Sequence, residues 1–259
     1  MKVALFGYGK TGSKVAELLA EDETVSLAWI ATASGKSETA PPQDFYQGQQ
    51  RGLVPILPIK KVLTKNWLKN NQVDVIIDFS NPAALLEYGK AVADAGIKLV
   101  TCVSAYQEVQ HVELRKLAKK TAVLWSPNIT LGINFLLMAA KAIKAAMPGA
   151  DISVTEEHFR EKPELSGTAV RIANELGTDT AAINMIRSGG ILGVHEVLFG
   201  YDNELLRLRH ESINRKAFGA GALFAAKALV KERKGFFKME DLLAPYFRQS
   251  TRKPRLIGK

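Results

Sequence analysis

Residues 1–20, MKVALFGYGKTGSKVAELLA, decide the fold of this chain. Lys2–Phe6 is a short, mostly apolar run that predicts a buried strand, and Gly12–Ala20 carries apolar residues at helical spacing. Between them lies a G-x-G-x-x-G sequence, in which the first glycine allows a tight turn and the second lets the backbone approach a pyrophosphate. The third glycine lets the helix pack closely on the strand. The stretch therefore predicts a dinucleotide-binding loop made of Gly7, Tyr8, Gly9, Lys10, Thr11 and Gly12.

The next hundred residues continue the alternation of strands and helices. Apolar runs predict strands at Val25–Ala31, Val73–Phe79, Lys98–Val103 and Ala122–Trp125. Periodic segments predict helices at Pro82–Ala95 and Glu108–Lys120. Residues 32–61 are rich in Ser, Gly, Pro and Gln and predict an extended loop with one short strand. Such alternation is typical of a parallel α/β sheet of the Rossmann type.

After Ser126-Pro127-Asn128 the pattern changes to mixed α and β segments. The predicted helices are Gly132–Ala146, Ser166–Leu176 and Gly221–Lys234, and the predicted strands are Asp151–Glu157, Ile191–Phe199 and Glu204–Ser212. The fold class is therefore α/β, a Rossmann dinucleotide-binding domain with a second α+β mixed-sheet domain. We expect residues 1–129 and 216–259 to form the first domain and residues 130–215 the second.

The net charge of +9 is concentrated near the C-terminus. Residues 205–259 hold 14 Lys and Arg against 4 Asp and Glu, whereas residues 1–204 hold 21 against 22. A solvated helix face with a basic tail explains this distribution. The alternative explanation is a site that attracts an anionic small molecule. No aromatic stripe or nucleic-acid motif accompanies the basic residues, so we expect no nucleic-acid partner.

The chain shows no feature of a membrane or secreted protein. No stretch approaches the roughly 18 apolar residues of a membrane span, and the N-terminal apolar run is too short for a signal peptide. The single cysteine, Cys102, excludes an internal disulfide and suits a reducing compartment. We therefore expect a cytoplasmic protein without a membrane partner, in which Cys102 is a buried small residue rather than a nucleophile.

The end of the second predicted strand bears on cofactor choice. An acidic residue there usually binds the adenosine ribose of NAD, but the sequence is Ile30-Ala31-Thr32-Ala33-Ser34-Gly35-Lys36. Thr32, Ser34 and Lys36 are suited instead to a 2′-phosphate. The sequence predicts NADPH, with NADH left possible, and the alternative is that Lys36 is only a surface residue.

Residues 156–169, EEHFREKPELSGTA, form a second group of reactive side chains. His158 titrates near neutral pH and is suited to donate a proton, while Lys162 is suited to stabilise developing negative charge. Ser166, Gly167 and Thr168 open a helix with N–H and hydroxyl donors that suit a carboxylate. The alternative is an ordinary surface loop. The remaining histidines have no ligand-like spacing, so we predict no metal site.

With these segments the chain resembles the dihydrodipicolinate (4-hydroxy-tetrahydrodipicolinate) reductase family nearly end to end. The most specific match is Glu157 to Ala169, against the family's E-x-H-H-x-x-K-x-D-x-P-S-G-T-A element. The others are the glycine loop, Asp78-Phe79-Ser80 with Pro82, Ser126-Pro127-Asn128 before Gly132-Ile133-Asn134, Arg187 to Gly193, and Ser212 to Ala222.

The resemblance implies a reaction and a site. A nicotinamide dinucleotide would deliver hydride to a cyclic imine dicarboxylate, His158 would protonate the neighbouring ring carbon, and Lys162 would assist. Substrate carboxylates would be bound by Ser166, Gly167, Thr168 and Arg215. Further cofactor contacts would be Thr101, Cys102, Val103, Ser126, Pro127, Asn128 and Ile129. The second domain would bind substrate and assemble a homotetramer.

Departures from the family pattern leave the substrate open. The second histidine of the pair is replaced by Phe159, at a position expected to bind substrate, and Pro163-Glu164 replaces the family's aspartate region. The family's G-T-T-G-F loop is replaced by Thr101-Cys102-Val103-Ser104-Ala105-Tyr106. The alternatives are a related reductase of another imine or carbonyl acid, and a non-catalytic NAD(P)H-binding regulator.

Overall fold

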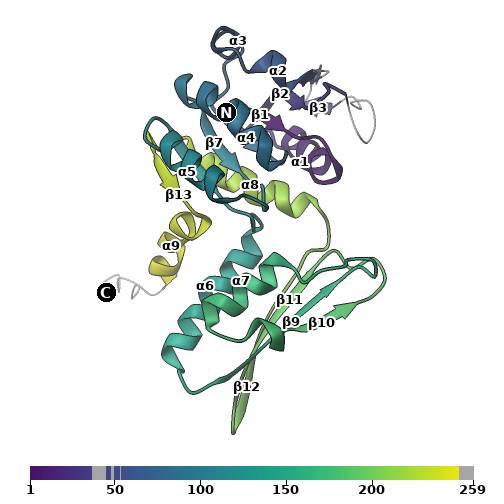
Figure 1. Cartoon of the computed structure of the whole chain (residues 1–259), viewed down its shortest axis with the longest axis vertical. Helices are drawn as coiled ribbons and strands as arrows, with labels where there is room; N and C mark the ends of the chain where they lie inside the picture. Colours follow the sequence, from purple (N-terminus) through teal and green to yellow (C-terminus); the bar gives the residue numbers. More distant parts are fainter. Residues whose placement is uncertain (37–44, 48–49, 53, 251–259) are drawn as a thin grey trace, which may run out of the picture.

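The computed structural model describes residues 1–36, 45–47, 50–52 and 54–250, which form an upper and a lower lobe in Figure 1. The upper lobe holds a seven-stranded sheet of order β13-β8-β7-β6-β1-β2-β5, in which every neighbouring pair is parallel. Its strands are β1 (Lys2–Phe6), β2 (Ser26–Thr32), β5 (Ile56–Pro58), β6 (Val75–Asp78), β7 (Lys98–Thr101), β8 (Ala122–Trp125) and β13 (Gly235–Phe237).

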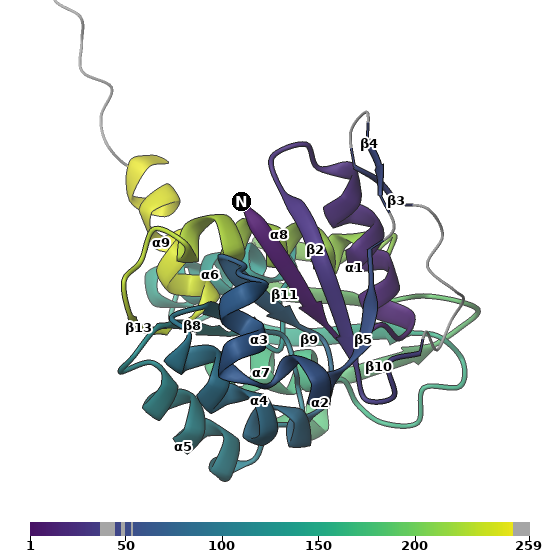
Figure 2. The same ribbon diagram turned by 90° about the horizontal axis from the view of Figure 1, so that it is seen from above.

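Helices cover both faces of this sheet, as Figure 2 shows. One face packs on α1 (Lys10–Glu21), α8 (Lys216–Leu229) and α9 (Met239–Ser250). The other packs on α2 (Ile59–Val62), α3 (Lys65–Asn70), α4 (Pro82–Asp94) and α5 (Glu108–Leu117). Because side chains alternate along a strand, Val3 and Leu5 of β1 enter the first core while Ala4 and Phe6 enter the second. Burial on both faces explains why β1 is apolar without alternation.

The lower lobe is a four-stranded mixed sheet of order β10-β9-β11-β12. Its strands are β9 (Asp151–His158), β10 (Asn184–Arg187), β11 (Val194–Tyr201) and β12 (Glu204–Glu211). β9 and β10 are parallel and the other pairs antiparallel. Helices α6 (Leu131–Ala146) and α7 (Gly167–Leu176) pack on one face. Two small elements lie outside these sheets. They are the antiparallel ribbon of β3 (Phe45–Gln47) and β4 (Gln50–Gly52) in the upper lobe, and the short 3-10 helix η1 (Thr180–Ala182) after α7.

The chain crosses between the lobes twice, first after β8 and again before α8. After the return, α8 packs against α1 and β13 extends the first sheet. At the crossing, a Cβ on Gly221 would lie 1.9 Å from the carbonyl oxygen of Ile129, so α8 approaches the outgoing strand–helix connection at backbone distance. The exact division of the chain into domains stays a prediction.

The fold class expected from the sequence, a Rossmann-type parallel sheet followed by a second, mixed sheet, is confirmed, with corrections to individual elements. The predicted bounds of the helix Gly221–Lys234 are wrong, since α8 runs from Lys216 to Leu229. Gly219 and Gly221 lie inside this helix, where their small size allows close packing. The strand predicted from Ile191 begins at Val194. The sequence analysis predicted none of the elements α3, β10, β13 and α9. Within residues 32–61 one short strand was predicted, whereas the structure has the three strands β3, β4 and β5 and the helix α2. Residues 37–44, 48–49 and 53 lie outside the described part. Across the described residues, no helix has the length and apolar character required to cross a bilayer.

Candidate functional site

The glycine loop between β1 and α1 has the geometry of a phosphate cradle. Gly7 has a φ of +88° and donates its N–H to the carbonyl of Ala31 at 2.8 Å. A Cβ on Gly7 would lie 2.6 Å from the carbonyl oxygen of Phe79, and one on Gly12 would lie 2.3 Å from that of Gly7. No side chain caps α1, and its first turn contains no acid. The first-turn N–H groups and the positive end of the helix dipole are therefore available to an anion.

A cavity of about 430 Å³ opens beside this loop, at the carboxyl ends of β1, β2 and β6. This is where open parallel sheets bind nucleotides. Of the predicted cofactor residues, Gly7, Tyr8, Gly9 and Thr32 line it, whereas Lys10, Thr11, Gly12, Ser34 and Lys36 do not. Sequence reasoning missed Ile59 and Lys60, which reach the cavity from α2, and also Ser80, Asn81 and Glu87. Size, glycine geometry and free N–H groups all fit a dinucleotide.

In the turn after β2, the hydroxyls of Thr32 and Ser34 form hydrogen bonds with backbone groups of the same turn. Thr32 Oγ1 donates to the carbonyl of Lys36 at 3.1 Å and accepts from the N–H of Gly35 at 2.9 Å. The Lys36 N–H reaches Ser34 Oγ at 3.3 Å. A Cβ on Gly35 would lie 2.6 Å from Pro58, so the turn lies against the connection from β5 to α2. Lys60 is therefore the lysine at this end of the cavity among the described residues.

A buried carboxylate organises the neighbouring loop between β7 and α5. Asp78 has no exposed surface and accepts hydrogen bonds from Ser80 N–H at 2.8 Å and Tyr88 OH at 2.5 Å. Thr101 Oγ1 donates to it at 3.1 Å and is bonded to Tyr106 OH at 2.7 Å. Burial raises the pKa of Asp78, against the effect of these donors. The Thr101 hydroxyl is thus engaged within the protein. Sequence reasoning identified Asp78 only as part of a family motif.

The segment Ser126–Ile129 joins the two lobes and links the two predicted sites. Ser126 Oγ donates to the carbonyl of Asn128 at 2.9 Å, and Ile129 is buried in the first core. Thr168 Oγ1, at the start of α7, donates to Asn128 Oδ1 at 2.5 Å. One hydrogen bond therefore connects a predicted cofactor residue to a predicted carboxylate-binding residue. The roles of both stay predictions.

A second, smaller cavity of about 90 Å³ lies at this junction. It brings together three predicted residues, His158, Thr168 and Asn128. Phe159, Lys162, Ser166, Gly167 and Arg215 are not among its lining residues, and the side chain of Phe159 is 37% exposed. Sequence reasoning missed the other lining residues, which are Thr130, Ile133, Leu192, Gly193, His195, His210, Ser212 and Phe218.

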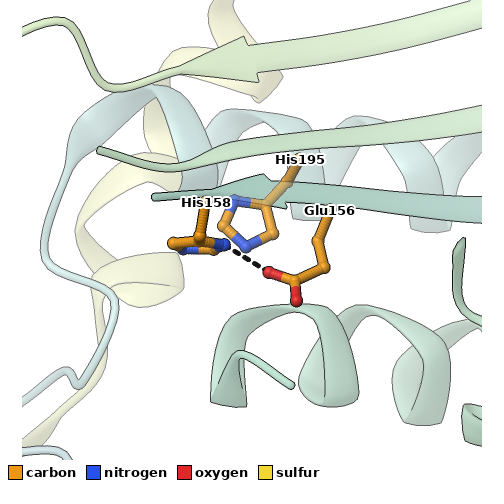
Figure 3. A group of neighbouring side chains, drawn as sticks. All are labelled: Glu156, His158 and His195. Carbon is orange, nitrogen blue, oxygen red and sulfur yellow. Dashed lines mark ion pairs between the residues drawn. The ribbon is translucent and has the colours of Figure 1, made fainter. Parts of the chain in front are cut away.

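Three adjacent strands place polar side chains in a row beside this cavity. Glu156 and His158 share the inward face of β9, two residues apart. His195 of β11 is opposite Glu156, and His210 of β12 is opposite His195. Figure 3 shows the Glu156 carboxylate paired with Nδ1 of His158, with the His195 ring beside them. The Nε2 edge of His158 faces Gly193, where an added Cβ would lie 3.1 Å from it.

Burial and charge set the protonation of this row. Burial lowers the pKa of His158, and the charges of Lys162 and Arg187 act in the same direction against the opposing Glu156. Burial lowers the pKa of His195 to about 3, so its ring is neutral and its Nε2 bonds Ser166 Oγ at 2.9 Å. Burial alone would raise the pKa of Glu156, but the Arg187 hydrogen bond and neighbouring charges hold it below its usual value. Glu156 is therefore ionised at neutral pH.

The same three residues have the composition of a metal-binding group, with ligand atoms within 4.8 Å of one another. The sequence missed this proximity, because His195 lies far along the chain from His158. Each side chain already has a protein partner: Glu156 contacts Arg187 and His158, and His195 contacts Ser166. These partners account for the group without a metal, and we propose none.

Two family models match almost the whole chain. The model described as dihydrodipicolinate reductase, N-terminus, matches residues 1–129, and that described as dihydrodipicolinate reductase, C-terminus, matches residues 132–243. A protein named 4-hydroxy-tetrahydrodipicolinate reductase from Thermosipho africanus is 35% identical over 76% of this chain and 89% of its own length. One of the same name from Burkholderia mallei is 28% identical over 94% and 98%.

A solved structure shares the fold. Dihydrodipicolinate reductase from Paenisporosarcina sp. TG-14, determined with bound dipicolinate, superposes with a TM-score of 0.74 and 20% identity. The match covers 92% of this chain and 97% of the other. At this identity the likeness establishes the arrangement of both lobes.

Proposed function

The chain belongs to the dihydrodipicolinate reductase family, and from this premise we propose that it reduces 4-hydroxy-tetrahydrodipicolinate to tetrahydrodipicolinate in the diaminopimelate and lysine pathway. A nicotinamide dinucleotide, bound at the glycine loop, supplies the hydride. The observation that carries the proposal is the cavity where the proton donor His158 and the hydroxyl of Thr168 lie beside Asn128.

The residues of this cavity have distinct tasks in the proposed reaction. His158 presents Nε2 toward the cavity and transfers its proton to the ring carbon next to the reduced position. The backbone N–H groups of Gly167 and Thr168 at the start of α7 are suited to bind a carboxylate of the substrate, because Ser166 caps the helix by accepting from Ala169 N–H and leaves these earlier N–H groups free. The Thr168 hydroxyl itself donates to Asn128 Oδ1. Lys162 and Arg215 are proposed to neutralise the dicarboxylate from outside the cavity.

Turnover of freshly made dihydrodipicolinate with NADPH and with NADH tests this function directly. The proposal expects saturable oxidation of the cofactor that depends on the dicarboxylate. Turnover only of other imino or keto acids would favour a related reductase. Cofactor binding without any turnover, together with salt-sensitive DNA binding, would favour a regulator.

We propose NADPH as the preferred cofactor, with Lys60 as the cation for its 2′-phosphate. The end of β2 offers no acid for ribose hydroxyls, and Lys60 lines the adenosine end of the cavity beside Thr32 and Ala33. Lys36, the residue expected from the sequence, accepts a hydrogen bond from Thr32 within the turn and is not among the residues that line the cavity.

Replacing Lys60 by methionine is expected to raise the Kd of NADPH about tenfold, since a hydrogen bond to a charged group contributes about 1.5 kcal/mol or more. The Kd of NADH should stay unchanged, because NADH lacks the 2′-phosphate. Fluorescence titration of both cofactors measures this. Lys61→Met, at the next and exposed position, is the matched control. If Lys36→Met weakens NADPH and Lys60→Met does not, the assignment based on sequence is the right one.

We further propose that the protein is a cytoplasmic homotetramer assembled through the lower lobe. The face of the four-stranded sheet opposite α6 and α7 has no covering helix in the described part of the chain, and Ile186 and Leu205 are exposed on this face. Light scattering during size exclusion is expected to give four times the chain mass. A monomer that retains full turnover would refute the assembly.

A further inference from the structure

Arg187 connects the two residues expected to act on the substrate. Its Nη2 donates to Glu156 Oε1 at 2.6 Å, and Glu156 pairs through its other oxygen with Nδ1 of His158. Its Nε donates to the carbonyl of Lys162 at 2.9 Å, and its Nη2 also reaches that of Glu164 at 3.0 Å. One guanidinium therefore holds both the acid beside the proton donor and the loop that carries the lysine.

We propose that Glu156 and Arg187 are a positioning pair: the carboxylate fixes the imidazole of His158 with a proton on Nδ1 and Nε2 toward the cavity, while the guanidinium fixes the carboxylate and the loop carrying Lys162. Neither residue touches the substrate. This inference rests on the proposed function, because it assigns His158 as the proton donor.

The local charges explain why such a pair is needed. His158 is 8% exposed, and it faces Lys162 from its loop, Arg187 from β10 and the neutral rings of His195 and His210 from β11 and β12. Burial and the two cations all lower the pKa of His158, and a lower pKa removes the proton that the reaction requires. Glu156 is the carboxylate that opposes them, among the ion pairs of the described residues.

Orientation is the second contribution of the carboxylate. Glu156 has no exposed surface, and Arg187 leaves it little freedom to rotate. A carboxylate held beside Nδ1 favours the form of the neutral ring that carries its proton on Nδ1, so that Nε2 takes up and delivers the catalytic proton.

The chain contains a matched control for this pair. Glu157, the next residue on β9, lies on the opposite face of the sheet and forms an ion pair with Arg209 at 2.8 Å. It is again a glutamate–arginine pair between strands of the same sheet, but it contacts neither His158 nor the loop of Lys162. A general effect of removing a charge from β9 would appear equally in both pairs.

Four variants separate the two pairs: Glu156→Gln, Arg187→Lys, Glu157→Gln and Arg209→Lys. We expect Glu156→Gln to lower kcat at pH 8 about tenfold and to move the descending limb of the kcat–pH profile about one unit toward lower pH, since one pKa unit corresponds to a tenfold change. Arg187→Lys should also lower kcat at pH 8 and shift the descending limb toward lower pH. The Kd of NADPH should be unchanged in all four variants, and Glu157→Gln and Arg209→Lys should keep the wild-type kcat and pH profile.

Nitrogen-15 NMR of histidine-labelled protein without substrate gives a readout independent of turnover. We expect the neutral ring of His158 to carry its proton on Nδ1 in the wild type, and its titration midpoint to fall in Glu156→Gln. A wild-type ring protonated on Nε2 overturns the inference, even if a variant fails to fold. A Glu156→Gln enzyme with unchanged kcat and pH profile overturns it as well. If the NMR result is as expected and dihydrodipicolinate is not reduced, the positioning pair stands and the proposed function fails.

Discussion

Replacing His158 by alanine is expected to lower kcat by about 10²–10⁴-fold, the usual contribution of a positioned proton donor. The ring lines the cavity together with Thr168 and Asn128, and its removal takes away the proposed proton source for the reaction. NADPH affinity should change little, because the glycine loop lies in the other lobe. Steady-state kinetics with dihydrodipicolinate, together with fluorescence titration of NADPH, measure both quantities.

His111→Ala is the matched control for this substitution. His111 lies on α5, packs against Trp125 and does not line the second cavity. We expect it to keep wild-type kcat within a small factor. A His158→Ala enzyme that keeps most of its turnover would remove His158 from the mechanism, whatever its cofactor affinity.

Replacing Gly221 by alanine is expected to lower the free energy of unfolding by about 3 kcal/mol, at the upper end of overpacking effects. The new methyl group would meet the carbonyl oxygen of Ile129 at 1.9 Å and its carbonyl carbon at 2.8 Å, and backbone atoms cannot move aside as a side chain end can. Helix α8 must therefore shift away from the connection between the lobes. For a chain of this size, the loss corresponds to a fall in Tm of roughly 6–12 °C.

Thermal unfolding followed by circular dichroism measures this effect. Gly149→Ala is the control, because no atom lies within 4 Å of its added Cβ and its φ is not in the left-handed region. Addition of saturating NADPH should raise the Tm of both variants, provided the glycine loop stays intact. A Gly221→Ala protein as stable as the wild type would mean that α8 can shift without cost.

The sequence determined the upper lobe well, because its information there is local. The run Lys2–Phe6, the glycine spacing and the following helix each follow from contacts between residues near in the chain, and the structure places them as expected. The edge strands of that sheet could not be predicted from the sequence. β5 and β13 have three residues each, too few for a periodic pattern, and their pairing with β2 and β8 is decided by packing. The glycines in α8 indicated a helix boundary by propensity, whereas the structure uses them for close approach.

The sequence by itself also indicated the candidate site residues His158 and Lys162, since both lie in one continuous motif. Only the tertiary structure decided what surrounds them. Pairing of β9 with β10 brings Arg187 to Glu156, and pairing with β11 brings His195 beside both. The parallel pairing of β2 with β5 likewise places Lys60, rather than Lys36, at the end of the cavity beside Thr32 and Ala33. Strand register joins residues that are 25 to 40 positions apart, and no local periodicity encodes that register.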